Sequence, residues 1–282
     1  MEYQKLPNWQ KIPELKDLLD LSTPPKELYY CGTFNPDIFK NCAAVVGSRK
    51  MTGYGSRVIE KIIPALVHQG KTIVSGFMYG VDQYAHEVAL ESGGKAVAVL
   101  GYGIDTPLEG KEAKLAEKII SAGGLLLSEW ETQKAALWTF PARNRIVAAL
   151  SSEVIVVEAA EKSGSLITAA LACKLKRKLW AVPGPITSRT SAGTNSLIAS
   201  GKAQMWLANT PGVGGSAVSP GAEGVDNPIL QTLLSEALTA DELARKLELP
   251  VSETGAKLSL LLLSGQIIEK AGKYYINDEG NF

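Results

Sequence analysis

The apolar positions between residues 43 and 184 fall into six short runs, separated by longer amphipathic stretches. The runs are AAVVG at 43–47, TIVSG at 72–76, KAVAVLG at 95–101, LLLSE at 125–129, EVIVVEA at 153–159 and KLWAVPG at 178–184. They are rich in Val, Ile, Leu and Ala, and they lack the polar alternation of a strand with one solvated face. The pattern predicts a parallel sheet covered on both faces, which is a doubly wound α/β fold.

The stretches between the runs have the periodicity of amphipathic helices. They are RVIEKIIPALVHQG at 57–70, AHEVALESGG at 85–94, KEAKLAEKIISAGG at 111–124, RNRIVAALS at 143–151 and SLITAALACKLKR at 165–177. Gly70, Gly93 and Gly123 stand where a helix commonly ends in a left-handed residue. We therefore expect strands and helices to alternate through this part of the chain.

The rest of the chain divides into three further parts. Residues 1–42 show little periodicity and predict a lead-in that adds an edge segment to the sheet of the domain at 43–208. Residues 209–228 hold five glycines and three prolines, which predicts a flexible linker. Residues 229–282 predict a helix, a second helix with Thr239 as its N-cap, a third from about Ser252 to Leu263, and a hairpin. That order is typical of a small winged-helix domain.

Charge is distributed unevenly along a chain of 282 residues whose net charge is zero. Residues 43–206 carry 19 Lys and Arg against 13 Asp and Glu, whereas residues 207–282 carry 5 against 10. A basic middle suggests an anionic partner for that region. The acidic tail disfavours duplex DNA as the partner of the winged helix, which makes a protein contact or simple packing at least as plausible.

The chain shows no membrane span or signal peptide, so we expect a cytoplasmic protein. Cys31, Cys42 and Cys173 are scattered and fit reduced structural thiols, which disfavours thiol catalysis and metal binding. There is no Walker loop, and GYGID at 101–105 stops short of a dinucleotide fingerprint. No Ser/His/Asp triad is apparent, and His86 is expected to be a packed core histidine. The chain is interpreted as a binder without cofactor or enzymatic activity.

The loops after the predicted strands collect Gly, Ser, Thr, Arg and Asn. Ligands of open α/β sheets bind at the carboxyl ends of the strands. In GSR at 47–49, Gly47 allows close approach, and Ser48 and Arg49 can bind a phosphate, although a plain turn fits about as well. Ser75 and Gly76 could add donors for a second phosphate. SGSLIT at 163–168 fits a helix cap and, slightly better, an anion site.

FPARNR at 140–145 places an aromatic just before a predicted helix and two arginines at its start. Phe140 could stack on a base while Arg143 and Asn144 meet phosphate, as in proteins that hold single strands without sequence preference. The alternative is that Phe140 fills the core and Arg145 bridges to a glutamate across a dimer contact. For Arg145 we favour the structural role, and for Arg143 the DNA contact.

Taken together in one order, these motifs resemble the DNA-processing protein A family, also called DprA or Smf. The resemblance runs from about residue 24 to 207, and it rests on GSR, SGFMYGVD, AVLGYGID, FPARNRI, VIVVEAAEKSGSLITAALA, AVPG and GTNSLIASGKA. It implies an extended Rossmann-like fold, a homodimer, binding of single-stranded DNA during natural transformation, and delivery of that strand to the RecA recombinase. The tail resembles the winged-helix domain of the same family.

The resemblance also implies an anion pocket. Carried onto this chain, its residues are Gly47, Ser48, Arg49, Ser75, Gly76, Phe140, Arg143, Asn144, Ser163, Gly164 and Thr168. The chain departs from the family where GVDQYAH replaces GIDTxAH, where Tyr79 replaces a small or basic residue, and in its reduced N-terminal region. The first two departures could change how a strand lies.

Two other functions remain open from the sequence. The same kind of fold resembles, more distantly, phosphoribohydrolases that release a base from a nucleoside monophosphate. Their PGGxGTxxE stretch has no match here, because PGPITSRTSAGTN at 183–195 lacks the glutamate. The second alternative is a regulator that binds duplex DNA through the winged helix.

Overall fold

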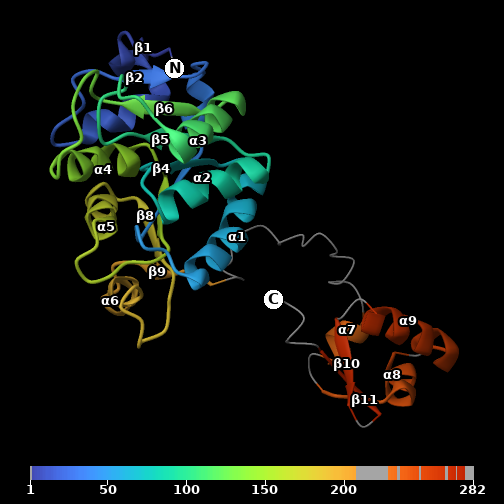
Figure 1. The fold of residues 1–282 in the computed structure, drawn as a ribbon. Coiled ribbons are helices and arrows are strands. Elements are labelled where there is room, and N and C mark those ends of the chain that lie inside the picture. The colour runs from blue at the N-terminus through green and yellow to red at the C-terminus, as the bar shows by residue number, and fades with distance from the viewer. Residues whose placement is uncertain are drawn as a thin grey trace. The chain divides into compact units, whose positions relative to one another are not determined.

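The computed structural model describes residues 2–207, 228–233, 236–247, 249–263, 266–270 and 272–276. The predicted linker, apart from Pro228, lies outside these residues. The chain forms two compact units, Met1–Ser216 and Ala217–Phe282, each of which is described by itself. The first is an α/β unit and the second is built of helices and a hairpin (Figure 1).

A nine-stranded sheet runs through the described part of the α/β unit. In spatial order its strands are β1 (Gln4–Lys5), β2 (Tyr29–Cys31), β6 (Leu125–Ser128), β5 (Ala96–Val99), β4 (Thr72–Ser75), β3 (Cys42–Val46), β7 (Glu153–Val156), β8 (Lys178–Ala181) and β9 (Gln204–Met205). Neighbours from β6 to β9 are parallel, whereas β2 runs antiparallel to β6 and β1 antiparallel to β2. All six strands expected from the apolar runs are present.

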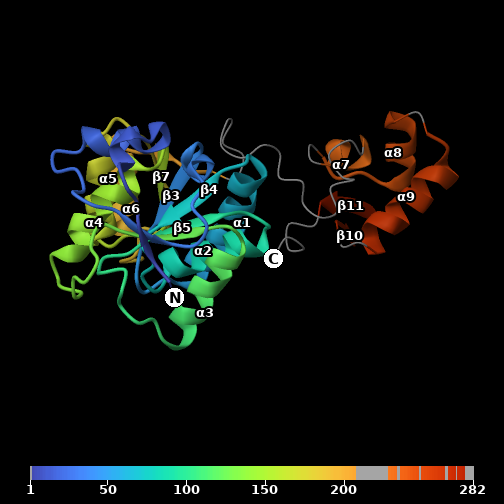
Figure 2. The same ribbon diagram turned by 90° about the horizontal axis from the view of Figure 1, so that it is seen from above.

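Helices cover both faces of the sheet, as Figure 2 shows. On one side lie α1 (Gly53–His68), α2 (Val81–Glu91) and α3 (Gly110–Ser121), and on the other α4 (Thr139–Ala149), α5 (Ser165–Lys174) and α6 (Ala192–Ala199). Successive residues of β3 point into opposite cores, Ala43 into one and Ala44 into the other. Both faces of the sheet are therefore buried under helices, and the doubly wound fold is confirmed.

The helix ends agree with the glycine signals, but α1, α2 and α4 each begin four residues earlier than expected. Gly70, Gly93 and Gly123 have φ of 70°, 73° and 76°, directly after α1, α2 and α3. The periodicity placed the first helix from about residue 57, whereas α1 begins at Gly53. Its N-cap is Thr52, whose Oγ1 accepts hydrogen bonds from the backbone N–H groups of Tyr54 and Gly55.

The lead-in segment joins both the sheet and one core. Short 3-10 helices lie at Trp9–Lys11, Pro13–Asp20 and Pro36–Phe39. Leu15 and Leu18 from the second of these pack with residues of α4 and α5. The lead-in therefore extends the sheet beyond β6 and covers the α4 face.

The order of the strands places a switch point beside β3. The chain builds β3, β4, β5 and β6 in one direction, and then β7 pairs with the other side of β3. The loops that follow β3 and β7 consequently diverge to opposite faces of the sheet. A crevice outside the carboxyl ends of strands at such a point is the usual ligand site of this fold.

The second unit has the elements of a winged helix: α7 (Pro228–Leu233), α8 (Ala240–Lys246), α9 (Val251–Leu263), β10 (Ile267–Lys270) and β11 (Lys273–Ile276). Thr239 and Glu242 form a reciprocal capping box at the start of α8, so the predicted N-cap is confirmed. The apolar core of this unit contains Leu243, Leu258 and Ile267. Among the helices of both units that the structure describes, none has the length and apolar character to cross a membrane.

Candidate nucleic-acid interface

The loop after β3 is fixed in place by the start of α2. Gly47 lies so close to Val81 that a Cβ at this glycine would come 2.6 Å from a Val81 methyl group. The Ser48 carbonyl accepts a hydrogen bond from the Val81 N–H at 3.2 Å, and Ser48 Oγ accepts one from the Lys50 N–H at 3.0 Å. The loop thus turns back on itself and presents Arg49 to solvent.

Arg49 and Phe140 come together from distant parts of the sequence. The Arg49 guanidinium carbon lies over the Phe140 ring, 5.0 Å from its centroid. Phe140 belongs to the first turn of α4 and is half-buried, with its ring against Gly101 in the loop after β5. The structure therefore brings the GSR and FPARNR motifs into one site, where a cation and an aromatic face lie side by side.

A second contact joins α4 to the start of α5. The Asn144 amide donates to the Gly164 carbonyl at 3.3 Å, and the Ser163 and Ser165 hydroxyls lie 2.8 Å apart. Gly164 is exposed, and Ser163 and Asn144 are half-buried. The predicted residues of the SGSLIT motif therefore adjoin the same helix that carries Phe140, beside a helix N-terminus that favours anions.

Glu158, near the end of the apolar run EVIVVEA, joins three of these loops by hydrogen bonds. Its carboxylate is 1% exposed and accepts from the Thr52 N–H at 2.9 Å and the Thr52 hydroxyl at 2.5 Å. The Thr190 hydroxyl donates to it at 3.4 Å. A glutamate that ends an otherwise apolar run was the available signal. Its hydrogen bonds fix the loops after β3, β7 and β8 around the switch point.

The structure corrects the prediction for Ser75, Gly76 and Thr168, because all three are buried. The Ser75 hydroxyl donates to the Val45 carbonyl at 2.6 Å, so it joins two neighbouring strands. Gly76 is pressed against the Arg143 guanidinium and the Asp82 carboxylate, which leave no room for a Cβ. These three positions support the site from below and do not form its surface.

Arg143 is likewise corrected. Its side chain is 2% exposed and its Nη1 donates to the carbonyl oxygens of Gly76 and Val99, at the ends of β4 and β5. Burial lowers the pKa of Arg143 to about 10, and the neighbouring Asp82 acts against that shift. Burial also raises the pKa of Asp82, against the effect of Arg143. Arg143, which was expected to contact phosphate, therefore binds main-chain carbonyls beneath the loops.

The structural role favoured for Arg145 is confirmed. Its two terminal nitrogens each lie 2.6 Å from a Glu129 carboxylate oxygen, in a bidentate pair, and its Nε donates to the Thr23 carbonyl at 2.8 Å. The glutamate belongs to the same chain, so the pair joins α4 to the loop after β6 and to the lead-in.

His86 is a packed core residue, as expected. It is fully buried in α2, its ring lies 6.2 Å from that of Phe77, and burial lowers its pKa to about 3. A histidine held neutral in this way is a poor general base or acid near neutral pH. In the residues that the structure describes, no three His, Cys, Asp or Glu side chains gather as a metal site would require.

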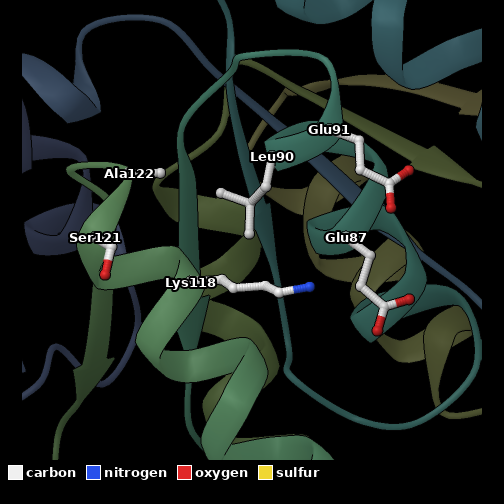
Figure 3. Close-up of a pocket in the computed structure, with 6 residues that line it drawn as sticks. All are labelled: Glu87, Leu90, Glu91, Lys118, Ser121 and Ala122. Carbon is white, nitrogen blue, oxygen red and sulfur yellow. The ribbon is translucent and has the colours of Figure 1, made fainter.

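A pocket of about 440 Å³ lies apart from these loops (Figure 3). It is lined by Glu87, Leu90, Glu91, Lys118, Ser121 and Ala122, from the second half of α2 and the end of α3. Figure 3 shows the Lys118 side chain extending past Leu90 toward Glu87. Because α2 begins at the Arg49 loop and runs away from it, this pocket lies toward the amino ends of the parallel strands. Its two carboxylates do not suit an anionic ligand.

The fold and the site together define a Rossmann-like α/β protein, followed by a winged helix. An exposed cation lies over a half-buried aromatic ring beside its switch point. Residues 6–213 match the family model for DNA recombination-mediator protein A, and residues 216–273 match that for the DprA winged helix domain. The chain belongs to the DNA recombination-mediator protein A family.

Named relatives agree with this assignment. Protein Smf of Escherichia coli is 36% identical over 250 residues, which cover 82% of this chain and 66% of that protein. The DNA processing protein DprA of Streptococcus pneumoniae is 40% identical over 204 residues, 71% of each chain.

Two solved structures share the fold. That of Streptococcus pneumoniae DprA has a TM-score of 0.64 at 36% identity and covers 73% of this chain and 71% of that one. That of Helicobacter pylori DprA has a TM-score of 0.63 at 33% identity, covers 73% of this chain and 91% of that one, and is described in terms of its single-stranded DNA binding mode. The family and fold expected from the motifs are confirmed.

Proposed function

We propose that this protein binds single-stranded DNA across the carboxyl ends of its parallel strands, with the Arg49–Phe140 pair as the central contact. The observation that carries the proposal is the guanidinium 5.0 Å from an aromatic ring, in an exposed loop at the switch point. A guanidinium binds phosphate oxygens bidentately, and a neighbouring aromatic face stacks a base of any identity. The binding mode described for the Helicobacter pylori relative supports the same ligand.

The biological role proposed from family membership is wider than the contact itself. We infer that the protein acts in the cytoplasm as a homodimer, protects incoming single strands during natural transformation, and loads a RecA-type recombinase onto them. Membership of a family of DNA recombination-mediator proteins supports this role. The matched region spans 66% of the Escherichia coli relative and 71% of the Streptococcus pneumoniae relative, and this wider role rests on that shared region.

We further propose that the strand is held without being cleaved or otherwise changed. Glu158 at the switch point is committed to Thr52 and Thr190, and His86 is buried and neutral. Neither is poised to move a proton on a ligand beside Arg49. Nucleoside-monophosphate hydrolysis, which the distant resemblance would allow, receives no support from these groups.

The test is a titration of the full chain with a labelled oligothymidylate, a duplex and a nucleoside monophosphate at several salt concentrations. Arg49→Ala should weaken single-strand binding by about tenfold or more and reduce the slope of log affinity against log salt by about 0.7, because one phosphate contact is lost. Arg49→Lys should recover part of the affinity, since it restores the charge without the planar fork.

Lys61→Ala is the matched control. Lys61 is an exposed cation of the same α/β unit, but it lies on α1, away from the Arg49 loop. It should bind within about twofold of wild type. Equal losses of single-strand affinity in Lys61→Ala and Arg49→Ala would show that binding depends on overall positive charge and not on a specific Arg49 contact. Release of base from the monophosphate, or tighter binding of duplex than of single strand, would overturn the proposed function.

A further inference from the structure

An exposed tryptophan stands at the start of the helix that carries Phe140. The Trp138 side chain is 57% exposed, although it is among the largest apolar groups in the chain. Its indole packs edge-on against that of Trp130, with ring centroids 5.8 Å apart and planes at 84°. More than half of the Trp138 surface stays accessible beside this contact. The contact holds the ring in one orientation, and an accessible, oriented ring is what a stacking ligand needs.

The position of this pair continues the candidate site along the sheet. Arg49 follows β3, Phe140 lies on Gly101 after β5, and Trp130 follows β6. Neighbouring strands are about 4.8 Å apart, so the ends of β3 and β6, three spacings apart, are separated by about 14 Å. That length exceeds one nucleotide, so a strand that occupies the Arg49–Phe140 pair has further nucleotides within reach of Trp138.

The two loops under this surface are joined by hydrogen bonds. The N–H groups of Gly103 and Ile104 donate to the carbonyls of Gln133 and Trp130, at 2.7 and 3.0 Å. The Ser128 hydroxyl donates to the Tyr102 carbonyl at 2.7 Å. The loop after β6 is therefore held to the loop after β5, and Trp130 provides a fixed support for Trp138.

We propose that Trp138 is a second base-stacking position, supported by Trp130, which extends the single-strand path from Phe140 toward the β6 edge of the sheet. This inference rests on the proposed function, since it takes the occupant of the Arg49–Phe140 site to be a single strand. The ligand class is an unpaired nucleobase of any identity, because each base offers a π face.

The surroundings favour a nucleic acid over an apolar protein segment as the occupant. Cation and aromatic are already paired in the adjoining site, and Lys134, exposed in the same loop, can meet a backbone phosphate. The carboxylates of this loop have partners of their own. Glu129 binds Arg145, and Glu131 accepts from the Tyr3 hydroxyl at 3.1 Å. The charge of Glu129 is thus balanced by Arg145, and the Glu131 carboxylate is held toward Tyr3 of the lead-in.

The experiment compares Trp138→Ala and Trp138→Phe in the full chain, with two probes: an oligothymidylate and the same strand with abasic sites throughout. Trp138→Ala should weaken binding of the oligothymidylate about tenfold, and Trp138→Phe should stay within about threefold of wild type. Neither change should alter the salt slope, because no phosphate contact is removed. On the abasic strand, wild type and Trp138→Ala should bind equally.

Intrinsic fluorescence gives an independent readout. Binding of oligothymidylate should quench tryptophan emission in the wild type, and Trp138→Phe should lose part of that quench while keeping its affinity. Leu137→Ala is the matched control, since the neighbouring Leu137 is 94% exposed and offers no aromatic face. It should bind within about twofold of wild type.

The outcomes separate this inference from the proposed function. If wild type binds the strand and Arg49→Ala weakens it, but Trp138→Ala matches wild type, only the second stacking position is overturned. An equal loss for Trp138→Ala on the abasic strand also overturns it, because the effect then does not depend on bases. If wild type does not bind the oligothymidylate, the proposed function fails first.

Discussion

The residues expected at the strand ends occupy two depths, and the two layers use the same kinds of side chain differently. The rim surface, defined by Arg49, Phe140 and Trp138, is open to solvent at least in part. The layer beneath it, defined by Asp82, His86 and Arg143, is buried. One arginine therefore faces a ligand, and another of equal charge binds main-chain carbonyls below. Sequence position at a strand end locates the rim, but it leaves the depth of each side chain open.

Depth can be inferred from the helix period, which a motif-based interpretation overlooks. Arg143 stands three, four and seven residues before Ile146, Val147 and Leu150, the large apolar side chains at the end of α4 and at its C-cap, and all of them are buried. That spacing marks the inner face of an amphipathic helix. An arginine in such a register should be assigned to the core side first and to a ligand second.

The largest effect is expected from Arg143→Leu. The change leaves the buried Asp82 without its cation and two buried carbonyls without a donor, which should lower the free energy of unfolding by about 3–5 kcal/mol. Urea unfolding followed by tryptophan emission measures it selectively, because all five tryptophans lie between residues 9 and 206, within the α/β unit.

A double variant sharpens the same comparison. Adding Asp82→Asn to Arg143→Leu removes the unpaired carboxylate and should restore about 1–2 kcal/mol. Arg49→Ala, from the rim surface, should change the free energy of unfolding by less than about 0.5 kcal/mol while weakening the binding of single-stranded DNA. An Arg143→Leu protein with wild-type stability and lost DNA binding would contradict the division into layers and return Arg143 to the ligand.

Much of the architecture was accessible from the sequence because it depends on local pattern. Apolar runs fixed the six parallel strands, and glycine predicted the ends of three helices. The early start of α1 was missed because its N-cap, Thr52, is held from a distance by Glu158. β9 was missed because a two-residue edge strand shows no period. Arg49 and Phe140 could be named as candidates, but their contact depends on packing between α4 and the loop after β5.

The next largest effect concerns His86 and pH. Burial lowers its pKa from 6.5 to about 3, so between these values the unfolded chain binds a proton that the folded chain does not. Stability from this residue should therefore fall as pH decreases from 6.5, by about 2 kcal/mol at pH 5. The measurement is urea unfolding of wild type and His86→Leu at pH 7.5 and pH 5.

His68→Gln is the control for that prediction, since His68 is the other histidine of the chain and is exposed. It should lose stability between the two pH values as wild type does, whereas His86→Leu should lose about 2 kcal/mol less. Asp82, whose pKa burial raises, contributes with the opposite sign in all three proteins. Parallel pH profiles for wild type and His86→Leu would show that the ring is protonated in the folded state.

The smallest effect is expected in the winged helix, where α9 presents little free charge. Lys257 is paired with Glu253 at 2.7 Å, one helical turn away, and Leu260 is exposed. A surface pair of this kind is worth about 0.3–0.5 kcal/mol and leaves the lysine charge compensated. Within the described residues of α9, this lysine is the cation that a groove-binding role would need.

Lys257→Ala should accordingly leave single-strand and duplex affinity within about twofold of wild type, in the same titration in which Arg49→Ala should lose single-strand affinity. Glu253→Gln is the matched counterpart, because it frees the lysine charge without removing it. If freed Lys257 gains duplex affinity and Lys257→Ala loses it, the winged helix contacts DNA and Lys257 is a second DNA-binding cation beside Arg49. If both variants bind as wild type does, Lys257 makes no contact with DNA, and its behaviour differs from that expected of Arg49 on the rim surface.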